Sequence, residues 1–251
     1  MRRIAIALLV ACAPEAPSVA PPPKVPQMTT RAGPCFEEQI HVESFCIDKY
    51  EAYVVELDAR GEERPHSPYE VVEGLRVRAK VAPHVVPQGY ISQVQAKDAC
   101  ENAGKRLCRA DEYIRACRGK KELDLFPYGG GQRRPGACNE GKGSFVGIAF
   151  GANYDKLTYA QFNDPRLNQM EGGLAKTGSY PQCVSPDGAF DMVGNLHEWT
   201  EGPDVYGHVG FRGGSYGEAE KNGPGCFYVT TVHESTYHDY STGFRCCADA
   251  R

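Results

Sequence analysis

The sequence predicts one domain with a few short helices and strands, little regular secondary structure and disulfides that hold it together. Periodic apolar patterns are few and short. Turn-forming Gly, Pro and Asn recur every few residues from about residue 119 to the C-terminus. The chain also has 11 cysteines, and an even set of cysteines in an exported chain indicates disulfides. A loop-rich chain of this kind depends on such covalent links for its stability.

The first residues have the pattern of a secretory signal. Arg2 and Arg3 precede an apolar run from Ile4 to Ala11, which is too short to span a bilayer and suits the apolar region of a signal. The letters "LVAC" that end at Cys12 resemble a bacterial lipobox, which implies cleavage before Cys12 and lipidation of its sulfur. An ordinary signal peptide with a chance cysteine is the alternative. With Cys12 set aside, ten cysteines remain, which is an even number.

A tether follows the signal. Residues 13–34, "APEAPSVAPPPKVPQMTTRAGP", almost lack large apolar side chains and therefore do not pack a core. Their repeated proline favours an extended polyproline II chain. The expected organisation is a signal peptide over 1–11, a lipidated cysteine and tether over 12–34, and one domain over 35–251. The expected location is extracytoplasmic, on a bacterial membrane through the lipid.

The charge argues against nucleic acid as a partner. Lys and Arg number 28 against 32 Asp and Glu, a formal charge of -4, and no basic run occurs. Binding to phosphates needs a basic surface, so the expected partners are the membrane and a ligand.

Two helices and one or two strands are the regular elements that the pattern predicts. Phe45–Asp58 is rich in aromatic and β-branched residues, which favours a strand or two. A helix is expected after Ser92, because Ser92 and Gln95 have the spacing of a capping box, and Gly104 is expected to stop it. A second helix is expected over about 110–118.

Residues 191–202, "DMVGNLHEWTEG", contain the only tryptophan and a candidate cation loop. Asp191, Asn195 and Glu198 carry oxygen donors around a glycine turn, and such a loop can wrap a hard cation with carboxylate and carbonyl oxygens. A capped turn, whose Asp and Asn bond their own backbone, explains the same residues. The residues alone favour the capped turn, because no EF-hand spacing is present.

Residues 233–240, "HESTYHDY", suggest a zinc site, but the spacing disfavours it. The HExxH motif places two histidines four residues apart on one helix face, whereas His233 and His238 are five apart. Zinc catalysis is therefore not expected. A wider set of candidate ligands for other metal chemistry is His197, His208, Glu218, His233 and His238.

Residues 212–226, "RGGSYGEAEKNGPGC", lead to a single cysteine, Cys226. A reactive thiol needs a nearby cation or helix start to lower its pKa, and the nearest cation in the sequence is Lys221, five residues away. Other cysteines in an oxidising compartment make a disulfide the favoured state of Cys226.

Taken in order, six motifs resemble the sulfatase-modifying factor domain, the family of formylglycine-generating enzymes. The motifs, from about residue 45 to the C-terminus, are "FCIDKYEAY", "AKDACENAGKRLCRADEYIRACRG", "FPYGGG", "GAFDMVGNLHEWTEG", "FRGGSY" and "STGFRCCAD". The resemblance implies a C-type-lectin-like α+β fold. It also implies an activity, because active members oxidise a cysteine of a sulfatase peptide to formylglycine with molecular oxygen and copper held by two thiolates.

The chain departs from this family at the copper-binding thiols. The first thiol of the family lies two residues after the aromatic of the GGS-aromatic motif; that aromatic is Tyr216 here, and the thiol position is Glu218. A carboxylate does not replace a soft thiolate for Cu(I), and residues 219–225 contain no cysteine, so copper is not expected. His197 replaces the aromatic that commonly precedes the Glu-Trp pair. Ser215, Tyr216, Glu218 and His197 are the candidate pocket.

The resemblance further implies disulfide pairs. Family cysteines match Cys100–Cys246 and Cys117–Cys226. The six cysteines that are extra relative to the oxidases are expected to pair as Cys35–Cys46, Cys108–Cys247 and Cys138–Cys183. This scheme uses all ten and leaves Cys12 for the lipid.

The resemblance also favours calcium at the 191–202 loop. Family members bind calcium through side chains that match Asp191 and Glu198 and through carbonyls that match Gly194 and Leu196. Carboxylates are hard donors that suit this ion. Asn139 matches one ligand of a second family site.

The leading functional prediction is a lipid-anchored module that binds a peptide, glycan or protein and is not an oxidase. The scaffold alone does not specify the ligand, because function depends on the site. The alternative is a divergent oxidase that converts a substrate-peptide cysteine to formylglycine and uses Cys226 as its thiol. Metal chemistry through the histidine set named above is a third hypothesis.

Overall fold

The structure, a computed structural model, describes residues 33–151, 156–203 and 209–251. The predicted signal peptide, Cys12 and all but the last two residues of the tether lie outside these ranges, as does His208. None of the helices within the ranges is both long and apolar enough to cross a membrane.

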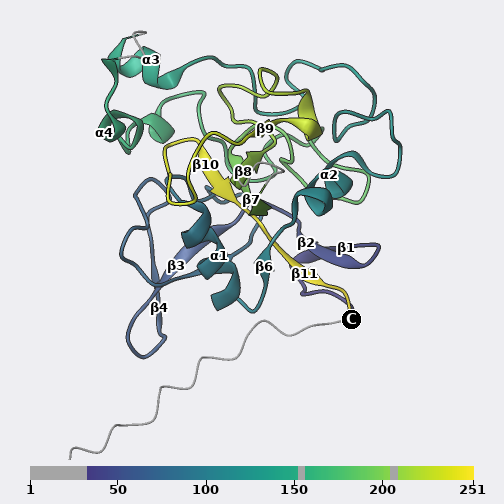
Figure 1. Cartoon of the computed structure of the whole chain (residues 1–251), viewed down its shortest axis with the longest axis horizontal. Helices are drawn as coiled ribbons and strands as arrows, with labels where there is room; N and C mark the ends of the chain where they lie inside the picture. Colours follow the sequence, from purple (N-terminus) through teal and green to yellow (C-terminus); the bar gives the residue numbers. More distant parts are fainter. Residues whose placement is uncertain (1–32, 152–155, 204–208) are drawn as a thin grey trace, which may run out of the picture.

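Three small sheets and four short α-helices form most of the regular structure of the described residues (Figure 1). The sheets have the strand orders β1-β2-β11-β6, β10-β7-β8-β9 and β4-β3-β5. The strands are β1 (Gln39–Val42), β2 (Phe45–Asp48), β3 (Tyr53–Leu57), β4 (Glu63–Pro65), β5 (Val77–Lys80), β6 (Arg106–Leu107), β7 (His197–Pro203), β8 (Val209–Arg212), β9 (Val229–Thr230), β10 (Thr242–Phe244) and β11 (Cys246–Asp249). The helices are α1 (Gln93–Asn102), α2 (Ala110–Arg118), α3 (Phe145–Phe150) and α4 (Tyr159–Phe162), with 3-10 helices η2 (Leu167–Gln169) and η3 (Gly225–Phe227).

Both predicted helices and the predicted strands are present. Ser92 caps α1: the Gln95 backbone N–H donates to Ser92 Oγ, and Gln95 Oε1 accepts from the Ser92 N–H, which is the predicted capping box. α2 covers the predicted range and ends at Gly119, whose φ of 72° favours glycine. The Phe45–Asp58 segment forms β2 and β3.

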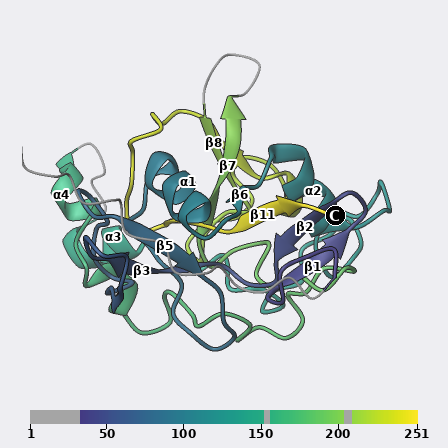
Figure 2. The ribbon, with the colours of Figure 1, turned by 90° about the horizontal axis from the view of Figure 1, so that it is seen from below.

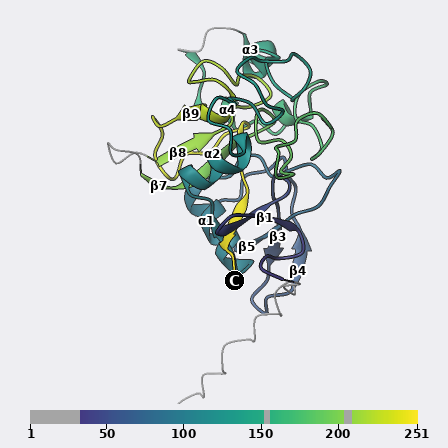
Figure 3. The same cartoon turned by 90° about the vertical axis from the view of Figure 1, so that its right-hand side faces the viewer.

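The C-terminal strand β11 joins the beginning and the middle of the domain. It pairs with β2 on one side and β6 on the other, both antiparallel. Figure 2 shows β6 and β11 running between α1 and α2. The C-terminus lies at the same end of the molecule as β1 and β4, and α3 and β9 lie at the other end (Figure 3). The Arg251 backbone N–H donates to the Pro34 carbonyl, so the domain begins beside its own C-terminus.

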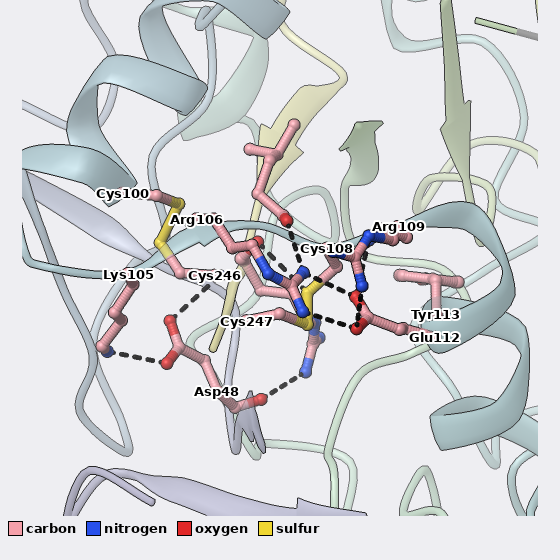
Figure 4. Close-up of a disulfide and its surroundings, with 12 residues drawn as sticks. Asp48, Cys100, Lys105, Arg106, Cys108, Arg109, Glu112, Tyr113, Cys246 and Cys247 are labelled. Carbon is pink, nitrogen blue, oxygen red and sulfur yellow. Dashed lines mark hydrogen bonds and ion pairs between the residues drawn. A yellow bond between two sulfur atoms is a disulfide. The ribbon is translucent and has the colours of Figure 1, made fainter. Parts of the chain in front are cut away.

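Five disulfides connect the loops. They use all ten cysteines of the described ranges. Two of them are the pairs that match family cysteines, and the other three are the pairs expected for the six extra cysteines. The pairs are Cys35–Cys46, Cys100–Cys246, Cys108–Cys247, Cys117–Cys226 and Cys138–Cys183. Because successive strand residues point to opposite faces, Cys246 reaches α1 while Cys247 reaches the start of α2, and β11 is covalently held on both faces (Figure 4).

The apolar core consists of two main clusters. One lies between α1, β5 and the β7–β8 pair and includes Trp199, Phe211 and Phe244. The other surrounds Tyr113 and Met192 and contains the sulfurs of three disulfides. The 191–198 loop, the first part of the predicted cation loop, contributes Met192 and Val193 to one cluster, and Trp199, directly after it, belongs to the other. Packing from two directions therefore fixes the conformation of the loop.

Candidate functional site

Charged side chains next to the β11 disulfides are paired with one another (Figure 4). The buried carboxylate of Asp48 accepts hydrogen bonds from Lys105 Nζ at 2.7 Å and from the Cys246 backbone N–H at 3.0 Å. Arg106 binds Glu112 through two hydrogen bonds of 2.7 and 2.6 Å. Each of these charged groups has an oppositely charged partner at hydrogen-bond distance. We therefore interpret this region as one that stabilises the neighbouring loops.

The predicted cation loop begins at Asp191 and ends at Glu198, and Glu198 is held by an arginine. Arg245 Nε lies 2.5 Å from Glu198 Oε2, and Arg245 Nη2 lies 2.7 Å from Oε1. Both side chains are buried. This bidentate pair is a strong, geometrically specific contact, and it engages both oxygens of the carboxylate that was expected to bind calcium.

Glu51, which the sequence reasoning missed, fixes the turn of this loop. Its Oε1 accepts from the Leu196 backbone N–H at 3.0 Å, and its Oε2 accepts from Asn195 Nδ2 at 2.5 Å. Asn195 has a φ of 58°, a left-handed conformation that costs a non-glycine residue free energy. The signal for Glu51 was an acidic residue inside the apolar segment "FCIDKYEAYVV", since a buried acid requires partners.

The loop and its neighbour bury more negative than positive charge. Glu51, Asp191 and Glu198 are buried carboxyls, and Arg245 is the guanidinium among them. Burial raises the pKa of Asp191 to about 6. Burial, followed by repulsion from Asp191, raises the pKa of Glu51 well above its usual range. A cation or a proton would relieve this excess of buried charge.

Some of the residues predicted to bind calcium have oxygen atoms that could contact such a cation, and others are already hydrogen-bonded. Asp191 Oδ2 accepts from the Gly178 backbone N–H at 2.7 Å. Asn139, which the resemblance assigned to a second site, contacts this loop: its Nδ2 donates to Asn195 Oδ1 at 2.8 Å, and its carbonyl accepts from the Asn195 N–H. Asn139 Oδ1 is buried and has no hydrogen-bond partner among the described residues.

Carboxylates and histidines do not gather around one point. Within residues 33–151, 156–203 and 209–251, no three His, Cys, Asp or Glu side chains are arranged to hold a metal ion together. Besides the Asp191 carboxylate, a cation at the 191–198 loop would therefore rely on backbone carbonyls and an amide oxygen, which calcium accepts.

The side chains of the predicted pocket residues make separate contacts, although two backbone hydrogen bonds of 2.7 and 3.1 Å join Ser215 and Glu218. Ser215 and Tyr216 are buried, and the Tyr216 hydroxyl donates to Asn168 Oδ1 at 2.9 Å. Glu218 is exposed, and its Oε1 accepts from the backbone N–H groups of residues 220 and 221 at 2.6 and 2.7 Å. Glu218 thus stabilises its own loop.

His197 lies in different surroundings from these three residues. Its ring packs against Phe211 and Tyr228, with centroids 4.7 and 5.3 Å apart. Its Nδ1 is buried, with no hydrogen-bond partner in the described part of the chain. Burial, with a smaller contribution from His233, lowers the pKa of His197 to about 3, so the imidazole is neutral at physiological pH.

Cys226 is a structural cysteine. It is fully buried at the centre of η3 and bonded to Cys117 on α2. Its backbone N–H donates to the Leu125 carbonyl at 2.8 Å. The loop that begins at Arg212 is therefore tied down at its end, and its cysteine is not available as a thiol.

The two remaining predicted histidines lie in an aromatic cavity of about 520 Å³. We call it the aromatic pocket and define it by six of its lining residues, which are Tyr159, His233, Tyr237, His238, Glu73 and Glu234. Sequence reasoning considered His233 and His238 as metal ligands only in the third hypothesis, and it missed Tyr159, which comes from a distant segment.

These features define a disulfide-linked α+β domain with a buried ionic centre. A family model described as the sulfatase-modifying factor enzyme 1-like domain, FGE-sulfatase, matches residues 25–250. The chain belongs to this family. No curated protein matches it.

Solved structures that resemble this chain include a Major Tropism Determinant, PvdO and CarF. The Major Tropism Determinant I1 variant has 13% identity and a TM-score of 0.49, with 87% of this chain and 54% of that chain covered. PvdO from Pseudomonas aeruginosa has 16% identity and a TM-score of 0.47, with 82% and 80% covered. CarF has 16% identity and a TM-score of 0.35, with 80% and 59% covered. The match thus spans about half the length of the Major Tropism Determinant chain.

Proposed function

We propose that this protein is a lipid-anchored, extracytoplasmic member of the family that binds a ligand and does not make formylglycine. The observation that carries this proposal is the state of the cysteines. All ten cysteines of the described ranges are in disulfides, and the position of the first copper-binding thiol is Glu218. Copper-dependent oxidation of the family type requires thiolate ligands.

The alternative, a divergent oxidase that uses Cys226, receives no support from the geometry. The Cys226 sulfur is buried and bonded to Cys117, so it would have to be reduced and exposed before it could bind copper. Reduction would also break the covalent link between η3 and α2, the two elements that this disulfide joins.

The anchor is proposed from the N-terminal pattern. The lipobox-like "LVAC" and the proline-rich tether precede a domain that begins beside its C-terminus. α4, which provides part of the aromatic pocket, lies towards the other end of the molecule (Figures 1 and 3). A membrane attached through the tether would therefore leave the pocket facing outward.

Intact mass spectrometry after alkylation without reductant tests both parts of the proposal. The mature, membrane-extracted chain is expected to take up no alkylating agent and to carry the mass of a lipid on Cys12. A Cys226 that is alkylated, together with one copper ion bound per chain, would support the oxidase instead. A soluble mature chain with a free Cys12 thiol would contradict the anchor.

We further propose that the 191–198 loop binds calcium. The excess of buried carboxylates and the unpartnered Asn139 Oδ1, which has no partner within the described ranges, support this assignment. The carbonyls of Gly194 and Leu196 and the side chain of Asp191 would supply the other donors, while Glu198 stays paired with Arg245. The role of the ion would be to stabilise the loop.

A further inference from the structure

The aromatic pocket has no role in the chemistry of the family motifs and is built from three separate segments, the first of which carries Glu73 between β4 and β5. Tyr159 begins α4, whereas His233, Tyr237 and His238 belong to the segment between β9 and β10. Tyr159 is 50% exposed and Val232, on the rim, is 81% exposed. Large apolar and aromatic surfaces left in contact with water at a cavity often mark a binding site.

The rings of the pocket are held in place without a ligand. His233 stacks on Tyr237 with centroids 3.8 Å apart, and Tyr159 is tilted against Tyr237 at 5.8 Å and against His238 at 5.4 Å. The Tyr237 hydroxyl donates to Asp239 Oδ2 at 2.6 Å. His238 Nδ1 lies 2.7 Å from Asn163 Oδ1. Such preorganisation reduces the entropy lost on binding.

The charges around these rings are negative. Glu73 and Glu234 line the pocket, and the buried Asp239 accepts the hydrogen bond from the Tyr237 hydroxyl. Within the described ranges, none of the three forms an ion pair with Lys or Arg, and no Lys or Arg lines the pocket. Burial lowers the pKa of both His233 and His238, so the imidazoles add no positive charge near neutral pH.

We propose that the aromatic pocket binds an organic cation, namely a primary ammonium or guanidinium group. The ring faces attract a cation through their quadrupoles, and the N–H groups of the cation can donate to Glu73 and Glu234. The inference rests on the proposed function, because it names the ligand class of a binding module. A neutral sugar could stack on the same rings but would gain nothing from the carboxylate charges, and an anion would be repelled.

Titration of the oxidised domain, followed by NMR or calorimetry, tests the ligand class. The probes are N-acetylarginine amide, for a peptide side chain, and putrescine, for a free amine. Their neutral counterparts are N-acetylcitrulline amide and 1,4-butanediol. Each cation that binds is expected to bind about tenfold more tightly than its counterpart, with an affinity that falls as salt is raised. The cation that binds more tightly shows whether the natural ligand is a peptide side chain or a free amine.

Variants locate the binding. Glu73→Gln and Glu234→Gln are each expected to lower the affinity for the cation by about threefold. Tyr159→Ala is expected to lower this affinity further, because a ring face is lost. Glu122→Gln, at an exposed acid beyond α2, is the matched control and is expected to bind like the wild type. Circular dichroism and the melting temperature of each variant report on folding, and the two Gln variants keep the test valid if Tyr159→Ala unfolds.

Several results would overturn the inference. These are equal binding of cations and neutral counterparts, unchanged binding by both Gln variants, or saturable binding of an oligosaccharide that exceeds that of either cation. The proposed function fails separately. If the chain has no free thiols and binds no cation, the proposed function stands and the pocket assignment is wrong. If the chain binds cations but has a reactive Cys226, the pocket assignment stands and the proposed function is wrong.

Discussion

His197 stands where related proteins commonly carry an aromatic residue, and its surroundings remain those of an aromatic residue. The imidazole lies among the rings of Phe211 and Tyr228, and its Nδ1 finds no partner in the described part of the protein. Burial lowers its pKa to about 3, whereas the pKa of histidine in an unfolded chain is about 6.5. The folded state therefore binds fewer protons than the unfolded state between these values.

This difference predicts acid sensitivity. The contribution of His197 to stability is complete above about pH 6.5 and is lost as the pH falls towards 3, with about 2 kcal/mol lost by pH 5. His197→Phe is expected to remove this part of the pH dependence, because phenylalanine does not titrate. Denaturant unfolding at pH 7.5 and pH 5 measures it.

The control is His41→Phe, at an exposed position of β1, which is expected to leave the pH dependence as it is. If His197→Phe loses as much stability between the two pH values as the wild type, the buried neutral histidine is not its source.

At the scale of elements, the 191–198 loop shows how a turn is specified by distant residues. Its left-handed residues Asp191 and Asn195 are held by side chains and backbone outside the loop, including Glu51 and Asn139. Gly194 is required there, because a Cβ atom at this position would collide with the Asn139 carbonyl oxygen. The loop motif therefore adopts this conformation only when the segments that carry Glu51 and Asn139 pack against it.

The proposed calcium at this loop is expected to stabilise the folded chain. Adding calcium at about 100 times its Kd to metal-free protein should raise the Tm by about 5–10 °C, and magnesium should do so less, because it demands a stricter geometry. Asp191→Asn is expected to abolish most of the calcium effect.

Asp98→Asn, on the exposed face of α1, is the control and is expected to respond to calcium like the wild type. A Tm that does not move with calcium, or that moves equally in Asp191→Asn, would rule out the site.

At the scale of the whole molecule, Arg245 connects segments that are far apart in the sequence. Besides the pair with Glu198, its guanidinium donates to the carbonyls of Asp48 and Phe190. It lies next to Cys246 and Cys247, whose disulfides hold β11. The Arg245–Glu198 ion pair and the two disulfides of β11 thus lie next to one another in the fold.

Removing this guanidinium should be costly. Arg245→Met leaves the buried Glu198 unpaired and is expected to lower the free energy of unfolding by about 3–5 kcal/mol. Adding Glu198→Gln to it should recover part of the loss, because the unpaired charge is then gone. Guanidinium chloride unfolding of the oxidised protein measures both variants. A single variant as stable as the wild type would mean that Glu198 is already neutral in the folded state.

Local signals were sufficient for part of this fold. The capping residues Ser92 and Gln95 and the terminal Gly119 marked α1 and α2, because helix ends are decided by a few adjacent residues. Two disulfide pairs, Cys100–Cys246 and Cys117–Cys226, followed from matching motifs to a family, and the other three were expected among the six cysteines that remained. The pairing of Glu198 with Arg245 was not predictable in this way, because the two residues are 47 positions apart.

The sequence by itself determined the fold class, the two main helices, the family and the absence of a thiol at position 218. Each of these depends on residue identity or on spacing along the chain. Only the tertiary structure decided that Glu198 is paired with Arg245, that Glu51 holds the loop, and that Tyr159 joins His233 and Tyr237 in one pocket. These are contacts between distant segments, and their geometry is set by packing and disulfides, which local patterns do not encode.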